Sequence, residues 1–196
     1  MLLGLLLLQL GWASDDGFEV IRTANDCVFE ARAKAHSEGA ALRATCHWAD
    51  VDPKAMGQLV TTYADYTDWL WPLAECNVVE TLPERTLVYQ RQQIMTLADR
   101  EVLLWMTKKQ NGSYTRVDWL AANEKPLELS PGAIRTPKNT GFWLIDAHPD
   151  GGSSVKHEVA VNAGGAAIPE FLLNWLRYKG FVSIIKDVRK HASQKK

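Results

Sequence analysis

Several features that mark familiar classes of protein are missing from this sequence of 196 residues. The five histidines are scattered without a paired spacing and the three cysteines fit no zinc pattern, so we predict no metal site. The sequence contains no Gly-x-Ser-x-Gly elbow, no His-Glu-x-x-His motif and no phosphate-binding loop. These absences argue against the common hydrolase, zinc-protease and nucleotide-binding classes, and we predict no cofactor.

The chain also has little net charge, a formal −1 from 22 basic and 23 acidic residues. A nearly neutral protein exerts no overall attraction on nucleic acid or on an anionic membrane, so we predict no nucleic-acid partner. One basic stretch stands out near the end of the sequence and consists of Lys186, Arg189, Lys190, Lys195 and Lys196. Such a stretch is usually a solvated helix end, and transient contact with anionic lipid headgroups is the alternative.

Cysteine is scarce, with Cys27, Cys46 and Cys76 only. An odd number does not indicate a disulfide framework. The sequence favours three small, buried apolar residues with free thiols. The alternative is a Cys27–Cys46 disulfide in an oxidising compartment, because the two residues fall on consecutive predicted strands.

No apolar run is long enough to span a bilayer, and the longest opens the sequence as MLLGLLLLQLGWA. Gly11 and Ala13 place small residues where a signal peptidase reads them, so we predict a signal peptide over residues 1–13. The protein is then exported, to the periplasm or outside the cell. No Lys or Arg precedes Arg22, and this lack of positive charge leaves a cytoplasmic location as the alternative.

What the sequence does contain is typical of one domain with a sizeable core, placed at residues 14–196. Hydrophobic residues make up 46% and charged residues 23%, as in ordinary globular proteins. The eight tryptophans need large apolar spaces and partners for their N–H groups. A Trp-rich core is the favoured interpretation, and a wide cavity or an amphipathic surface is the alternative. We expect a monomer.

Hydrophobic periodicity predicts strands, a helix, more strands and a long final helix. Alternation at Cys27, Phe29 and Ala31, and again at Leu42, Ala44 and Cys46, predicts an antiparallel hairpin within residues 17–50. Asp52 followed by Pro53 predicts a helix start. Six strands follow, near 76–82, 85–94, 100–109, 113–122, 139–147 and 154–162. Apolar residues at three- and four-residue steps then predict a helix from Pro169 to about His191.

Five short motifs accompany that order: Trp69 after the first helix, Tyr89 on the strand ahead of Asp99-Arg100-Glu101, Gly141-Phe142-Trp143, the run from Asn162 to Pro169, and Leu172-Leu173-Asn174. Together they resemble the START (StAR-related lipid-transfer) family of the helix-grip, Bet v 1-like superfamily, as a bacterial-type single-domain member. The resemblance implies an α+β fold with a curved antiparallel sheet wrapped around a long C-terminal helix. It also implies binding of a lipid or sterol in the cavity between them.

The candidate cavity residues are inward-facing strand positions and one stripe of the last helix: Tyr89, Arg100, Val102, Leu104, Met106, Trp119, Trp143, His157, Phe171, Leu172 and Trp175. Ordinary core packing explains the apolar ones equally well. Arg100 faces the cavity by resemblance, and a structural ion pair beneath the helix is an equal alternative. A lone histidine on an apolar face favours a satisfied core histidine at His157.

Three functions follow. The first is binding of a hydrophobic ligand that is carried, transferred or sensed, admitted by movement of the last helix or of the loop at 124–138. The second is a helix-grip enzyme of the cyclase, aromatase or hydrolase type, for which His157, Asp118 and Glu158 are the acid–base candidates. Simple alternation puts His157 and Glu158 on opposite faces, so we predict no catalysis. The third is an interaction module with a solid core and no ligand.

Overall fold

The computed structural model describes residues 17–32, 40–94, 97–165 and 179–194. The predicted signal peptide and the candidates Phe171, Leu172 and Trp175 lie outside these residues. The described elements, in chain order, are β1 (Glu19–Ala24), β2 (Cys27–Arg32), β3 (Ala40–Trp48), α1 (Pro53–Thr61), the 3-10 helix η1 (Tyr63–Asp68), β4 (Leu73–Thr81), β5 (Thr86–Gln92), β6 (Arg100–Asn111), β7 (Tyr114–Ala121), β8 (Ile134–Arg135), β9 (Lys138–Ala147), β10 (Ser153–Asn162) and α3 (Phe181–Gln194).

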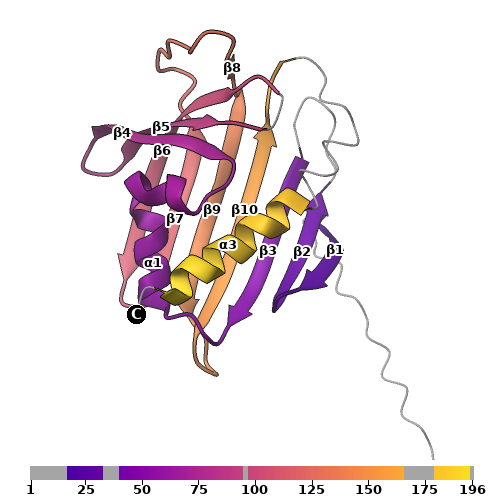
Figure 1. Cartoon of the computed structure of the whole chain (residues 1–196). Coiled ribbons are helices and arrows are strands. Elements are labelled where there is room, and N and C mark those ends of the chain that lie inside the picture. The colour runs from indigo at the N-terminus through magenta and orange to yellow at the C-terminus, as the bar shows by residue number, and fades with distance from the viewer. Residues whose placement is uncertain (1–16, 33–39, 95–96, 166–178, 195–196) are drawn as a thin grey trace, which may run out of the picture.

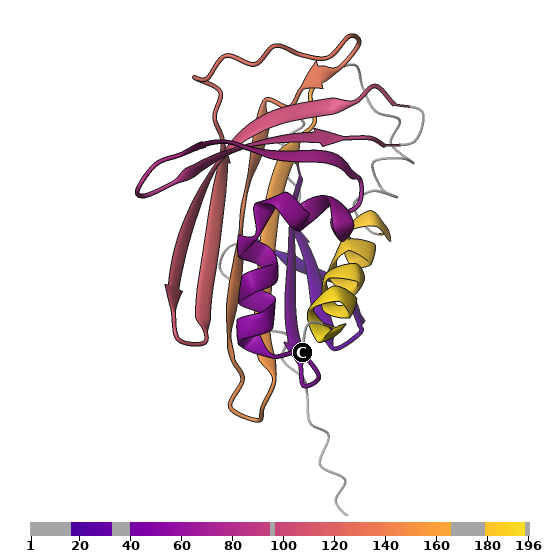
Figure 2. The ribbon, with the colours of Figure 1, turned by 60° about the vertical axis from the view of Figure 1, so that its left-hand side comes forward.

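The strands form one large sheet in the order β1-β2-β3-β10-β9-β7-β6-β5-β4, and the two-residue β8 pairs with β6 off this path. Neighbours along the path are antiparallel, whereas β8 runs parallel to β6. Both helices lie on one face of the sheet (Figure 1), and β4, β5 and β6 bend over one end of them (Figure 2). This arrangement confirms the predicted α+β, helix-grip architecture. We call the face that carries α1 and α3 the helix face and the opposite one the outer face.

Local chemistry explains where the elements begin and turn. The side chain of Asp52 caps α1 by accepting from the backbone N–H groups of Lys54 at 3.0 Å and Ala55 at 2.9 Å. The β1–β2 turn uses Asn25 and Asp26 with φ of 55° and 59°, a region that these short polar residues tolerate. The predicted helix start and the predicted strands after it are confirmed, and β1 and β8 are further strands that the sequence did not separate.

The main core lies between the helix face and the two helices. Every third or fourth residue of α3 enters it, namely Phe181, Ile185, Val188 and Ala192. Strands from both halves of the sheet contribute the residues that pack against the helices, including Phe29 of β2. The apolar periodicity that predicted the final helix is therefore the surface that attaches α3 to the sheet.

A second, smaller cluster of apolar residues lies on the outer face, and we call it the outer cluster. Its buried members are Leu87, Leu103, Trp105 and Ala122, with Leu82, Tyr89 and Leu127 packed against them. The loop between β7 and β9 covers it and is attached by hydrogen bonds. Ser130 N–H donates to the Glu101 carboxylate at 3.2 Å, and an Arg135 Nη2 N–H donates to the Ala122 and Lys125 carbonyls at 3.0 and 2.8 Å. The loop therefore lies over the outer face, and its role in admitting a ligand stays a prediction.

The cysteines correct the favoured sequence interpretation. Cys27 and Cys46 form a disulfide and lie directly opposite each other in the β2–β3 register, with Cα atoms 4.0 Å apart. Cys76 is the free, buried thiol. The odd number of cysteines was a poor guide, because one disulfide and one free thiol also make three. The alternation of the two strands was the better signal, since it puts Cys27 and Cys46 on the same face of the sheet.

Removing the disulfide should weaken the fold. We expect the Cys27→Ala/Cys46→Ala double variant to lose about 2–4 kcal/mol of unfolding free energy, because the cross-link restricts the unfolded chain. Urea denaturation with and without a reductant measures the loss. Reductant should destabilise the natural protein and leave the double variant unchanged. Three reactive thiols in the denatured, unreduced protein would contradict the assignment.

Candidate functional site

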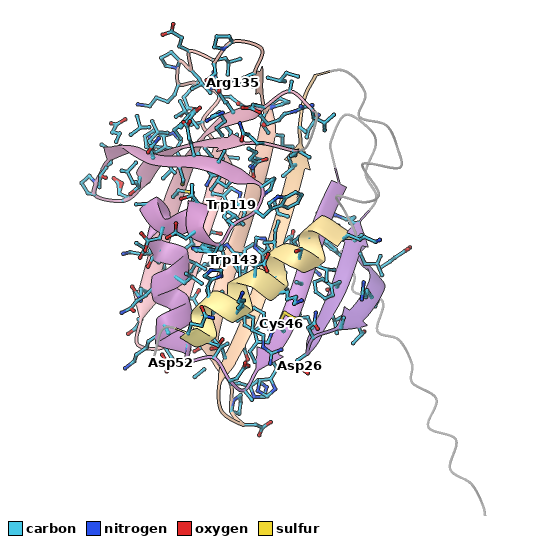
Figure 3. All side chains as sticks on the ribbon, viewed as in Figure 1. Asp26, Cys46, Asp52, Trp119, Arg135 and Trp143 are labelled. Carbon is cyan, nitrogen blue, oxygen red and sulfur yellow. A yellow bond between two sulfur atoms is a disulfide. The ribbon has the colours of Figure 1, made fainter. Side chains whose placement is uncertain are left out.

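Aromatic rings from three strands and α3 meet on the helix face. The ring of His157 stacks on Trp143 with centroids 3.7 Å apart and an interplanar angle of 11°. Phe181 of α3 lies on the same histidine at 5.5 Å and Trp119 at 5.6 Å. The register explains the meeting, because His157 of β10 is paired with Trp143 of β9, which is paired with Val117 of β7. Trp119 and Trp143 are labelled in Figure 3, next to α1 and α3 in this view.

A glycine opposite Trp119 makes room for its indole. Gly141 pairs with Trp119 across β7 and β9, and a Cβ atom at Gly141 would lie 2.5 Å from a ring carbon of that indole. It would also lie 2.2 Å from the Glu158 carbonyl oxygen. The indole N–H donates to the side-chain oxygen of Asn139 at 2.9 Å, which satisfies its polar atom. The Gly141-Phe142-Trp143 motif thus serves the aromatic packing directly.

His157 is a buried, neutral ring. Its Nδ1 lies 3.0 Å from the carbonyl oxygen of Phe142, and because a carbonyl only accepts, Nδ1 carries the proton. Burial lowers the pKa of His157 from 6.5 to about 3. The next residue, Glu158, lies on the outer face and accepts from Arg43 at 3.0 Å. The expected opposite orientation of His157 and Glu158 is confirmed, and His157 is satisfied as a core histidine.

The predicted β6 row lies on the helix face. Val102, Leu104 and Met106 are all buried in the main core. Gln90 of β5 pairs with Val102 and is 4% exposed, so it is a polar member of the same wall that the sequence reasoning missed. Alternation with Val88 inside the predicted strand at 85–94 was the signal that would have found it.

Arg100 opens the same row and is buried, with 4% of its surface exposed. One Nη1 N–H donates to the carbonyl oxygen of Ala98, and the buried Nε has no hydrogen-bond partner. The alternative of an ion pair beneath the helix is wrong for the described part of the chain, where the ion pairs with carboxylates belong to other basic residues. The resemblance placed Arg100 on the correct face.

No family model matches the sequence, and no curated protein matches it either. Solved structures do. A STAR-related lipid transfer protein from Xanthomonas axonopodis superimposes with a TM-score of 0.76 at 18% identity, over 90% of this chain and 99% of that one. Human StAR-related lipid transfer protein 5 gives a TM-score of 0.80 at 11% identity, over 93% and 89%.

The chain has the START fold. An aromatase/cyclase from Streptomyces is a more distant match, with a TM-score of 0.54 at 12% identity over 79% of this chain and 93% of that one. At these identities the likeness extends to the START fold and not to a ligand or a reaction. What the site binds has to be argued from its residues.

Tyr89 is a correction to the predicted site. It packs against the outer cluster, on the face of the START sheet opposite α3. Burial, followed by the negative charge of Glu101, raises the pKa of Tyr89. The alternation of β5 turns Val88 and Gln90 inward and Tyr89 outward, so its place beside the Asp99-Arg100-Glu101 motif did not imply that it faces the helices.

An ion-pair cluster attaches the C-terminal half of α3 to the rest of the START fold. Arg189 donates to Asp50 at 2.8 Å and to Asp26 at 2.9 Å, and this contact lowers the pKa of Asp50. Arg189 therefore serves the fold, whereas Lys186 and Lys190 of the predicted basic stretch are exposed. A surface pocket of about 280 Å³ lies beside this cluster and is lined partly by Trp48 and Ile185.

The low pKa of His157 predicts a pH-dependent stability. Between about pH 3 and pH 6.5 the unfolded chain binds a proton that the folded protein excludes. The contribution of His157 to the free energy of unfolding is therefore complete above pH 6.5 and is lost as the pH falls toward 3. The slope reaches about 1.4 kcal/mol per pH unit. Urea denaturation of His157→Gln over this range should lack that contribution, while His148→Gln, on a turn, keeps it. Identical slopes in both variants would contradict the assignment.

Proposed function

We propose that this protein binds one hydrophobic molecule of the lipid class on the helix face of its sheet and carries, transfers or senses it without chemical turnover. The START fold supports the proposal, since the Xanthomonas and human structures are both named for lipid transfer. Internal ligand sites are lined chiefly by apolar side chains, with a few polar groups that orient the ligand.

The observation that carries the proposal is the apolar row of β6 and its neighbour on β7. Val102, Leu104 and Met106 form a continuous strip on the helix face, and Met106 pairs with Trp119. The described part of α3 packs chiefly on α1 and β3, and α1 packs on β7 and β9. We therefore place the ligand along β6, beside Trp119. Each Å² of apolar surface buried there contributes roughly 25 cal/mol before the ordering costs of binding.

The acid–base candidates support binding rather than turnover. His157 is neutral and enclosed by Trp143 and Phe181, with its proton held toward a backbone carbonyl. Asp118 is engaged by Arg116 at 2.6 Å, and Glu158 by Arg43. General acid–base catalysis requires a group that can reach the substrate, and the stacking of His157 and the ion pairs of Asp118 and Glu158 argue against such a role.

We further propose that the protein is exported. The Cys27–Cys46 disulfide supports this location, because disulfides persist in oxidising compartments. Within the described ranges, no helix is long and apolar enough to cross a membrane.

A pair of tryptophan variants tests the ligand site. Trp119→Ala removes the indole beside the β6 row and should weaken binding of the neutral probe Nile red about ten-fold, equivalent to about 1.4 kcal/mol. Trp105→Ala removes a buried indole of the outer cluster and should leave the affinity unchanged. Fluorescence titration of both variants measures the difference.

Native mass spectrometry of the protein purified from its source gives an independent check, because a lipid should co-purify. No co-purifying lipid and no Nile red binding would favour an interaction module with a solid core. A reaction that is lost in His157→Ala while probe binding is retained would favour an enzyme.

A further inference from the structure

Arg100 is a buried cation whose charge no described carboxylate neutralises. A guanidinium stays protonated at any physiological pH. Only 4% of the residue is exposed, its Nη1 donates to the Ala98 carbonyl oxygen, and its Nε makes no hydrogen bond. A buried charge without a counter-ion is strongly unfavourable, so such a group indicates a partner that the described residues do not supply.

The two carboxylates beside Arg100 in the sequence are both engaged elsewhere. Asp99 accepts from Arg91 at 2.7 Å and from Gln93 at 3.2 Å. Glu101 points to the outer face, where both carboxylate oxygens accept from the Ser130 backbone N–H at 3.3 and 3.2 Å. The strand alternation that turns Arg100 inward turns Glu101 outward, so Glu101 cannot serve as the counter-ion.

The open edge of the guanidinium has a definite chemistry. With Nη1 occupied by a backbone carbonyl, the Nε and Nη2 N–H groups remain along one edge of the plane. Two parallel N–H donors at this spacing match the two oxygens of a carboxylate or of a phosphate. A hydroxyl group presents one oxygen, without charge, and would leave the cation uncompensated.

The surroundings of Arg100 fit the head of a long amphiphile. Gln92 pairs with Arg100 and Gln90 with Val102, so the adjacent strand supplies neutral polar side chains at this end of the wall. From Arg100 the apolar row runs through Leu104 to Met106, a distance of about 20 Å at about 3.3 Å per residue. This length accommodates an extended acyl chain whose polar group lies at Arg100.

We propose that the ligand is an amphiphile with an anionic oxygen head group, a carboxylate or a phosphate, bound by the Nε–Nη2 edge of Arg100, and that its apolar chain lies along β6. The inference rests on the proposed function and names the ligand class within it. A neutral sterol or a neutral glyceride would not supply the missing counter-ion.

Three probes that share one sixteen-carbon chain test the proposal: hexadecanoate, hexadecyl phosphate and hexadecanol. At neutral pH the protein should bind at least one of the anionic probes about ten-fold or more tightly than the alcohol, as a charge-assisted bidentate contact implies. The two anionic probes distinguish a carboxylate from a phosphate head. Competition against Nile red measures all three affinities under the same conditions.

Arg100→Gln should bind all three probes with nearly equal affinity. Its ligand-free form should be at least as stable as the natural protein, because the substitution removes an uncompensated charge. Arg91→Gln is the matched control, since Arg91 lies on the neighbouring strand and pairs with Glu75 and Asp99. This control should keep the full preference for the anionic probes.

The outcomes separate the two proposals. Equal binding of the acid, the phosphate and the alcohol by the natural protein would overturn the anionic ligand and leave lipid binding intact. Anionic preference that survives in Arg100→Gln would overturn the assignment to Arg100. Failure of the natural protein to bind any probe, Nile red included, would overturn the proposed function itself. If Arg100→Gln does not fold, the affinities of the natural protein for the three probes still decide the ligand class.

Discussion

The structure depends on the register of its antiparallel strands. β10 pairs with β9 along its whole length and with β3 from Ser153 to Val161, which joins the first and last strands into one sheet. A slip of one residue would turn every side chain of a strand to the other face. His157 would then leave the aromatic stack, and Lys156 and Glu158 would enter an apolar core. The desolvation of those charges strongly disfavours that alternative and keeps the register unique.

The same register separates the chemistry of the two faces. The helix face carries the aromatic stack and the apolar row of β6, whereas the outer face carries charged pairs such as Arg43–Glu158 and Arg116–Asp118. Phe142 lies beneath the Arg116 guanidinium at 4.4 Å, so the outer pairs also pack on an aromatic ring. Hydrophobic burial on one face and paired charge on the other leave the sheet a single apolar face for its helices.

Period-two alternation predicted the faces correctly wherever it was followed strictly, as for His157 against Glu158 and for Val102, Leu104 and Met106. The prediction for Tyr89 was wrong because it followed the family motif instead of the alternation. Tyr89 was placed on the helix face on account of its nearness to Arg100 in that motif. The Cys27–Cys46 pairing and the Gly141–Trp119 contact needed the register between strands, which one sequence does not contain. The ion pair between Arg189 and Asp26 joins residues that are distant in the chain, so local sequence patterns could not predict it either.

Arg100 shows how strand alternation decides which charges face a site. The motif Asp99-Arg100-Glu101 offers an acid on each side of the arginine, yet neighbours on a strand point to opposite faces and cannot meet. Asp99, just before the strand, forms an ion pair with Arg91. Glu101 accepts a hydrogen bond from Ser130 in the loop that covers the outer cluster. Both acids therefore stabilise the outer face and the strand ends, and the inward charge stays available. Burial of a cation that no carboxylate in the described ranges neutralises is a destabilising feature that proteins retain mainly at functional sites.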